Sequence, residues 1–145
     1  CRARMGAVVR RVLGASVGVD DEVVGSVAGP GLLAYVGITH ADVPGEVAWL
    51  ARKLWELRLL REERSASDVG APILVVSQFT LYGETSGGRR PSWIAAARPE
   101  QAEPLVALVV DELRRLGATV ATGRFRTDMQ VSLVNDGPVT VMLEL

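Results

Sequence analysis

Two short segments, far apart in the chain, place hydroxyl, amide and turn-forming residues at the ends of apolar runs. They are Ser77-Gln78-Phe79-Thr80 and Asn135-Asp136-Gly137-Pro138. The end of a strand holds polar groups rigidly at an opening, which suits binding or catalysis. Strand alternation would send Ser77 and Phe79 to one face of a sheet and their two neighbours to the other. These segments are the candidate functional residues of the chain.

Both segments also have an ordinary structural interpretation. The first could be a strand that ends in polar residues, with Thr80 present for its β-propensity. The second could be a tight turn between the last two strands, because turns favour Asn, Asp, Gly and Pro. The residue types alone leave packing and function both open.

Conventional catalytic residues are scarce, since the chain has one histidine and one cysteine. His40 would have to be the base of any Ser-His-Asp triad, but no pattern places it near Ser77. We therefore expect His40 to be a structural residue at a strand-to-helix junction. Cys1 alone can form neither an intramolecular disulfide nor a cysteine-based metal cluster. No nucleotide-binding glycine motif occurs, so we expect neither a metal nor a cofactor.

The size and composition predict one ordinary globular domain. The chain has 145 residues, of which 48% are hydrophobic, and a net charge of −1. No apolar run reaches the about 18 residues of a membrane span, and Arg10 and Arg11 interrupt the first apolar stretch, so we expect no signal peptide and a cytoplasmic protein. The small net charge argues against a protein that coats a nucleic acid, but not against one that binds a short end of it.

Residues 1–4 precede Met5 and are predicted to be an upstream extension or a cloning remnant.

Apolar runs in the first half of the chain predict strands at 6–12, 15–19, 22–27 and 32–38, with a hairpin at Asp20-Asp21 and a break at Gly29-Pro30-Gly31. A helix is expected to start near Asp42, a suitable N-cap, with Pro44 in its first turn. Residues 57–60 could continue this helix or begin a strand. The polar residues 61–71 are expected to form a loop.

The second half predicts a central strand at 72–79, buried on both faces. A long loop at 82–98, a helix at 100–116 and strands at 118–125, 129–134 and 139–145 follow. The order ββββ-α-β-α-βββ predicts an α+β fold of one domain. Its sheet, or barrel, is expected to be curved, largely antiparallel and backed by two helices.

Read together, the two segments resemble the signature motifs of the D-aminoacyl-tRNA deacylases. The likeness extends from Met5 to Leu145, and several long motifs in the right order make it specific. The other matching motifs are Val8-Val9-Arg10-Arg11-Val12, Val36-Gly37-Ile38-Thr39-His40, Gly88-Arg89-Arg90-Pro91-Ser92 and Met129-Gln130-Val131. The chain departs from the family pattern in a short 61–68 loop and in Arg126-Thr127, which replaces a smaller pair after Phe125.

The resemblance implies a proofreading hydrolase that cleaves the ester between a D-amino acid and the terminal ribose of tRNA, without a cofactor. It implies a homodimer in which a cis Gly137-Pro138 peptide reaches the partner's pocket and rejects L-amino acids. Arg11 matches the arginine that orients this peptide, and Met129 and Asn135 fall in the same substrate-binding set. The matching pocket segment, taken as catalytic, is Ser77, Gln78, Phe79 and Thr80.

Three points stay open at this level. Thr80 could be a nucleophile, but backbone N–H groups near Phe79 and the substrate's own 2′-hydroxyl could serve instead. Arg89 and Arg90 could contact phosphates at the acceptor end of tRNA or could be solvated loop charges. The chain could also be a non-catalytic nucleic-acid-binding module, or a proofreading module acting beside a synthetase. Its seven scattered aromatic residues do not form the stacking platform that single-strand binders use.

Overall fold

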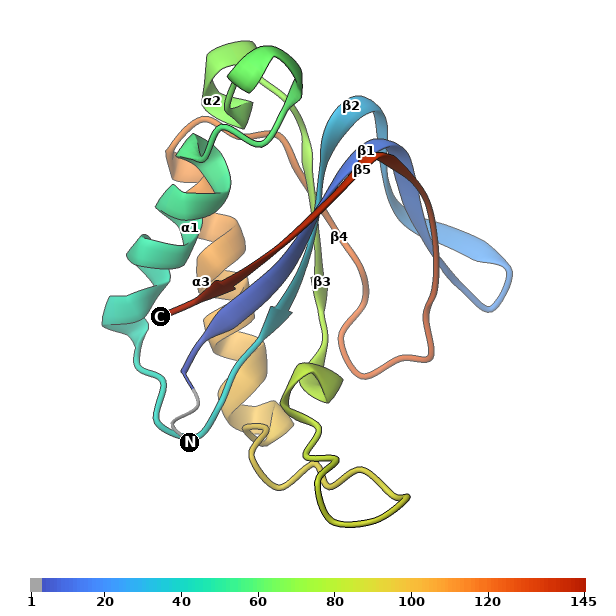
Figure 1. The fold of residues 1–145 in the computed structure, drawn as a ribbon, viewed down its shortest axis with the longest axis vertical. Coiled ribbons are helices and arrows are strands. Elements are labelled where there is room, and N and C mark those ends of the chain that lie inside the picture. The colour runs from blue at the N-terminus through green and yellow to red at the C-terminus, as the bar shows by residue number, and fades with distance from the viewer. Residues whose placement is uncertain (1–3) are drawn as a thin grey trace.

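The computed structural model describes residues 4–145, which form one α+β domain around a five-stranded sheet (Figure 1). Of the predicted leading segment 1–4, residues 1–3 lie outside the described part of the chain and Arg4 lies inside it. The elements in chain order are β1 (Gly6–Val19), β2 (Glu22–Gly37), α1 (Val47–Glu56), α2 (Ala66–Val69), β3 (Ile73–Ser77), α3 (Pro99–Arg115), β4 (Val120–Thr122) and β5 (Gln130–Glu144). Short 3₁₀ turns occupy Pro44–Glu46, Arg61–Glu63 and Phe79–Tyr82. The predicted fold class is confirmed.

The sheet is mixed, with strand order β4-β3-β2-β1-β5. β1 pairs antiparallel with β2 and β5, whereas β3 is parallel to both β2 and β4. The two parallel pairs follow from the helical connections, because a strand that returns through a helix can lie parallel to its predecessor. The prediction of a largely antiparallel sheet holds for its long strands. The barrel alternative is wrong, because β4 and β5 are free edges of an open sheet within residues 4–145.

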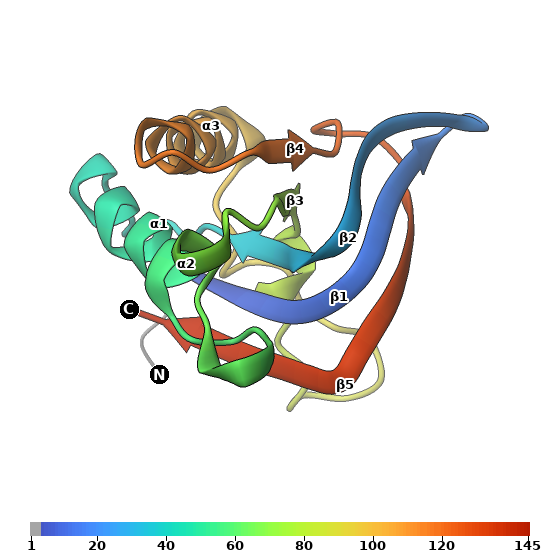
Figure 2. The ribbon, with the colours of Figure 1, turned by 90° about the horizontal axis from the view of Figure 1, so that it is seen from above.

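The long strands account for most differences in element number. The four predicted opening strands are two strands, β1 and β2, whose pairing shifts register between Val12 and Gly14 and between Val17 and Gly18. Such bulges bend a strand without ending it, and Figure 2 shows the resulting curve of β1, β2 and β5. Residues 129–134 and 139–145 likewise belong to one strand, β5. The interpretation of Asn135–Pro138 as a turn between two strands is therefore wrong.

Helices α1 and α3 cover one face of the sheet, as Figure 2 shows. Their apolar stripes, which include Leu50, Leu54 and Leu113, pack into the main core against Leu32 and Ile73. A second core fills the opposite, concave side, where the strands curl toward one another. It contains Val12, Val17, Leu33, Leu74 and Val76. No helix among residues 4–145 is long and apolar enough to cross a membrane.

Three local predictions need correction. Asp42 does not cap α1, because its carboxylate accepts from the backbone N–H of Met5 and Thr39; a 3₁₀ turn and then α1 begin later. The predicted 61–71 loop contains α2, which Ser65 caps by accepting from the Asp68 N–H at 3.0 Å. Residues 57–60 are in neither a helix nor a named strand, since α1 ends at Glu56.

We expect Leu113→Ala to lower the free energy of unfolding by about 2–5 kcal/mol, since a buried leucine loses contacts and leaves a cavity. Leu113 is fully buried in the main core, whereas Leu108, on the same helix, is 40% exposed. Leu108→Ala is therefore the matched control, with an expected loss below about 1 kcal/mol. Urea denaturation of both variants measures the difference, and equal losses would contradict the assignment of this core.

Candidate active site

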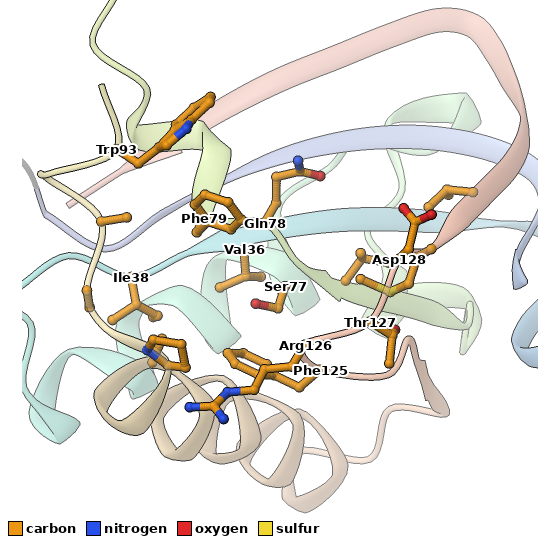
Figure 3. A pocket seen from close by; sticks show the side chains of 17 residues that line it. Val36, Ile38, Ser77, Gln78, Phe79, Trp93, Phe125, Arg126, Thr127 and Asp128 are labelled. Atoms are coloured by element: carbon orange, nitrogen blue, oxygen red, sulfur yellow. The ribbon is translucent and has the colours of Figure 1, made fainter. Parts of the chain in front are cut away.

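A cavity of about 480 Å³ opens at the carboxyl end of β3. Figure 3 shows its lining, which comes from four segments that are distant in sequence. They are the end of β2 with Val36 and Ile38, the segment from Val76 to Phe79, the segment from Trp93 to Ala102, and the segment from Phe125 to Val131. Residues of the first candidate segment thus border a pocket whose volume lies in the range of small-molecule binding sites.

The first candidate segment changes conformation inside its four residues. β3 ends at Ser77, and Phe79–Tyr82 forms a 3₁₀ turn. The predicted strand alternation is therefore wrong beyond Ser77, yet Ser77, Gln78 and Phe79 all line the cavity. Thr80 is not among the lining residues, and its hydroxyl accepts from the Gln78 side-chain amide.

The start of this 3₁₀ turn leaves backbone donors free. The Gln78 N–H donates to the Val36 carbonyl at 2.9 Å, and the Leu81 N–H donates to the Gln78 carbonyl at 3.3 Å. Among the backbone bonds of residues 4–145, none has the N–H of Phe79 or Thr80 as its donor. The first N–H groups of a helix generally lack an intrahelical partner. Free backbone N–H groups beside a pocket can bind an oxyanion, and of these two residues Phe79 lines the cavity.

One wall of the pocket is aromatic. The rings of Phe79 and Trp93 meet edge to face, with centroids 5.5 Å apart. A hydrogen bond links the loop that carries Trp93 to the segment after β2, because the His40 Nε2 donates to the Ile94 carbonyl at 2.6 Å. His40 does not line the cavity. This geometry agrees with the structural role expected for His40.

Charged residues stand at the rim. Arg126 and Asp128 are among the lining residues, and Arg126 adopts a left-handed φ of 61°. Its guanidinium lies 3.5 Å from the Glu100 carboxylate, an exposed pair of small energetic weight. Arg126-Thr127 departs from the family pattern in a way expected to alter the pocket rim or the tRNA contact, and both residues line the cavity. Trp93, Phe125 and Asp128 also line the cavity but were not predicted from the sequence. Phe125 and Asp128 follow β4, a position that could have identified them, whereas Trp93 lies in the loop between the Phe79–Tyr82 turn and α3.

The second candidate segment lies elsewhere on the molecule, on β5. Gly137 and Pro138 are exposed, their peptide bond is cis, and neither lines the cavity of its own chain. Arg11 of β1 donates from Nε to the Asp136 carbonyl at 3.1 Å. Asn135 accepts from the Thr140 hydroxyl at 3.4 Å, and its buried Nδ2 has no partner among the described residues.

Asp136 is held by two arginines. Arg61 donates to both of its carboxylate oxygens, at 2.8 and 3.2 Å, and the Arg11 Nε lies 3.4 Å from one of them. The hydrogen bonds from Arg61, and then the charges of Arg61 and Arg11, hold the pKa of the Asp136 carboxyl below its usual value. Neither Arg61 nor a role for the Asp136 side chain was identified from the sequence.

The predicted site residues therefore fall into separate groups. Ser77, Gln78, Phe79 and Met129 line the cavity, whereas Thr80, the next residue after Phe79, does not. A second group on β1 and β5 consists of Arg11, Asn135, Gly137 and Pro138. Arg89 and Arg90 are exposed in the loop before Trp93 and do not line the cavity, so their phosphate contact stays a prediction. Within residues 4–145 no group of three or more His, Cys, Asp or Glu could hold a metal ion.

Comparison with known proteins identifies the class. The model of the D-Tyr-tRNA(Tyr) deacylase family matches residues 8–144. The chain belongs to this family of hydrolases acting on ester bonds. It is 63% identical to the D-aminoacyl-tRNA deacylase of Thermobifida fusca and 60% identical to that of Streptomyces coelicolor, over 97% of this chain and 100% of each relative.

Two solved structures share the fold. One, described as c-Myc DNA Unwinding Element Binding Protein, is 36% identical, with a TM-score of 0.90 over 97% of this chain and 98% of that one. The other, a probable eukaryotic D-amino acid tRNA deacylase, is 14% identical, with a TM-score of 0.85 over 97% and 99% of the two chains. The second likeness shows the fold alone.

The conformation of Gly137 gives a testable prediction. Its φ is +112°, and a Cβ added there would lie 2.3 Å from the Arg11 guanidinium, so we expect Gly137→Ala to cost about 1–3 kcal/mol of unfolding free energy. Gly87→Ala is the matched control, because Gly87 has an ordinary φ and no atom within 4 Å of such a Cβ. Chemical denaturation compares them, and an unchanged midpoint for Gly137→Ala would contradict this account.

Proposed function

We propose that this protein hydrolyses the ester of D-aminoacyl-tRNA and leaves L-aminoacyl-tRNA intact. The observation that carries the proposal is the pocket at the end of β3, lined by Ser77, Gln78 and Phe79 in a chain of the deacylase family. The names of the bacterial relatives, which match this chain over nearly its whole length, support the same activity.

The proposed chemistry needs little catalytic equipment. An aminoacyl ester of tRNA is already activated, because it has a free hydroxyl next to it and a protonated α-amine. Orientation and a few oxyanion donors can supply the remaining acceleration. The unpaired N–H groups of Phe79 and Thr80 are the proposed donors, and the 2′-hydroxyl of the substrate helps to position the attacking water. No histidine base is required in this scheme.

The proposed chiral selection depends on a second copy of the chain. In this arrangement Gly137 and Pro138 reach the partner's pocket, where backbone atoms crowd the side of Cα that an L side chain would occupy. Two observations support it: both residues are exposed, and neither lines its own cavity. Apolar side chains near the pocket are also exposed, with Ile94 at 83% and Phe79 at 54%, which suits a covered surface.

The proposed substrate contact is confined to the acceptor end of tRNA. A net charge of −1 does not support a long phosphate-binding surface. Arg89 and Arg90 are exposed in the loop before Trp93 and are the proposed phosphate contacts. Because its substrate belongs to translation, the proposal includes a cytoplasmic location.

A non-catalytic nucleic-acid-binding module is the second candidate. It is favoured by the 36% identical structure, which is described as a c-Myc DNA Unwinding Element Binding Protein. The weak net charge of this chain and its scattered aromatic residues count against it. Binding of tRNA or DNA without turnover would support this second function.

An assay of the purified protein on D-tyrosyl-tRNA and L-tyrosyl-tRNA tests the main proposal. We expect the D-ester to be cleaved at least about 100-fold faster, which corresponds to about 2.7 kcal/mol of discrimination. Glycyl-tRNA should also be hydrolysed, because glycine has no side chain to meet the backbone wall. Comparable rates for both enantiomers would overturn the chiral mechanism, and an intact glycyl-tRNA would overturn its steric basis.

Thr80→Ala separates the two catalytic schemes. If backbone N–H groups and the substrate's hydroxyl act as proposed, kcat on D-tyrosyl-tRNA should change by no more than about fivefold. Loss of a true nucleophile would lower kcat by about 10⁴-fold or more. Thr80→Ser, which retains a hydroxyl, is the control for packing at this site. A large loss in the alanine variant with activity kept in the serine variant would establish the hydroxyl as essential.

A further inference from the structure

The segment at residues 136–139 is connected to the fold by a second arginine that the family resemblance did not indicate. Arg61 lies 75 residues from Asp136 in sequence and binds both carboxylate oxygens. Arg11 reaches the same residue from another side and binds its main-chain carbonyl. One arginine thus fixes the backbone before Gly137, and the other fixes the side chain of the same residue.

The geometry of the Arg61 contact distinguishes it from an ordinary surface ion pair. Its two parallel bonds, at 2.8 and 3.2 Å, match the planar guanidinium to the carboxylate, and such forked pairs are directional as well as strong. The Asp136 side chain is only 12% exposed, although Arg61 itself is 66% exposed. A nearly buried carboxylate needs its partners, whereas an exposed pair contributes little.

The backbone that carries Arg61 is also fixed. The Leu60 N–H donates to the Arg64 carbonyl at 2.9 Å and closes the turn around Arg61. Glu62 and Glu63 within it adopt positive φ values of 63° and 55°. Directly after the turn, Ser65 exchanges hydrogen bonds with Asp68 at 2.9 and 3.0 Å. Arg61 therefore reaches Asp136 from an anchored turn.

We propose that Arg61 is a positioning residue for Gly137 and Pro138, acting through Asp136 together with Arg11. The inference rests on the proposed function, because it assigns to Arg61 control over how strictly D- and L-esters are told apart. Holding Asp136 at both its carbonyl and its carboxylate prevents the peptide that follows from rotating about a single anchor. A misplacement of about 1 Å in an active site can change a reaction rate by about 100-fold.

The test compares Arg61→Ala with Arg64→Ala. The control removes an arginine from the same turn whose ion pair, within the described residues 4–145, is a 3.9 Å contact with Glu62. We expect Arg61→Ala to lower the ratio of kcat/KM for D-tyrosyl-tRNA over L-tyrosyl-tRNA by about tenfold or more, through faster cleavage of the L-ester. Arg61→Lys should give an intermediate ratio, since lysine cannot form the fork. A simple loss of stability would reduce both rates and leave their ratio unchanged.

A double-mutant cycle with Asp136→Ala checks the route. If Arg61 acts through the Asp136 carboxylate, adding Arg61→Ala to Asp136→Ala should not change the ratio further. Additive effects, or a ratio for Arg61→Ala within twofold of that for Arg64→Ala, would overturn the inference.

Hydrogen exchange tests the positioning role of Arg61 independently of the proposed function. Amides of residues 134–140 should exchange faster in Arg61→Ala than in Arg64→Ala, whatever the substrate is. Unchanged exchange would count against Arg61, whereas absence of D-ester cleavage by the wild-type protein would count against the function alone.

Discussion

The interrupted pairing between β1 and β5 is the constraint on which the second half of the site depends. Arg10 of β1 pairs with Thr140 of β5, and the next pair joins Val12 to Asn135. Four residues, 136–139, therefore face a single residue, Arg11, and cannot stay in the ladder. The strand must project there, and the one side chain opposite the projection is an arginine that binds it. Register thus determines both the exposed peptide and its first anchor.

The pocket depends on a different strand end. β3 is parallel to β2 and β4, so its carboxyl end meets the loop after β4 and the start of α3 at one edge of the sheet. A 3₁₀ turn begins directly after Ser77, and its first N–H groups have no partner among the described residues. The same change from strand to turn that ends the ladder supplies the donors that the proposed chemistry uses.

The sequence was sufficient for elements governed by local signals. The apolar periodicity of α3 and the run of branched residues in β3 placed both within one or two residues, except that β3 stops before Phe79. It could not distinguish a glycine that bends a strand from one that ends it, so β1, β2 and β5 were divided. The contact between Arg61 and Asp136 depends on how a distant turn lies beside β5, and no local pattern encodes that placement.

In the proposed mechanism, the pocket and the 136–139 segment require different degrees of rigidity. Hydrolysis of an activated ester tolerates a pocket partly open to solvent, because orientation and two donors supply most of what is needed. Discrimination between mirror images has no such tolerance, since the two substrates differ only in which side of Cα is occupied. The structure agrees with this requirement of the proposed mechanism: Arg126 at the pocket rim has an exposed ion pair with Glu100 at 3.5 Å, whereas Asp136 is held by two arginines, at main chain and side chain.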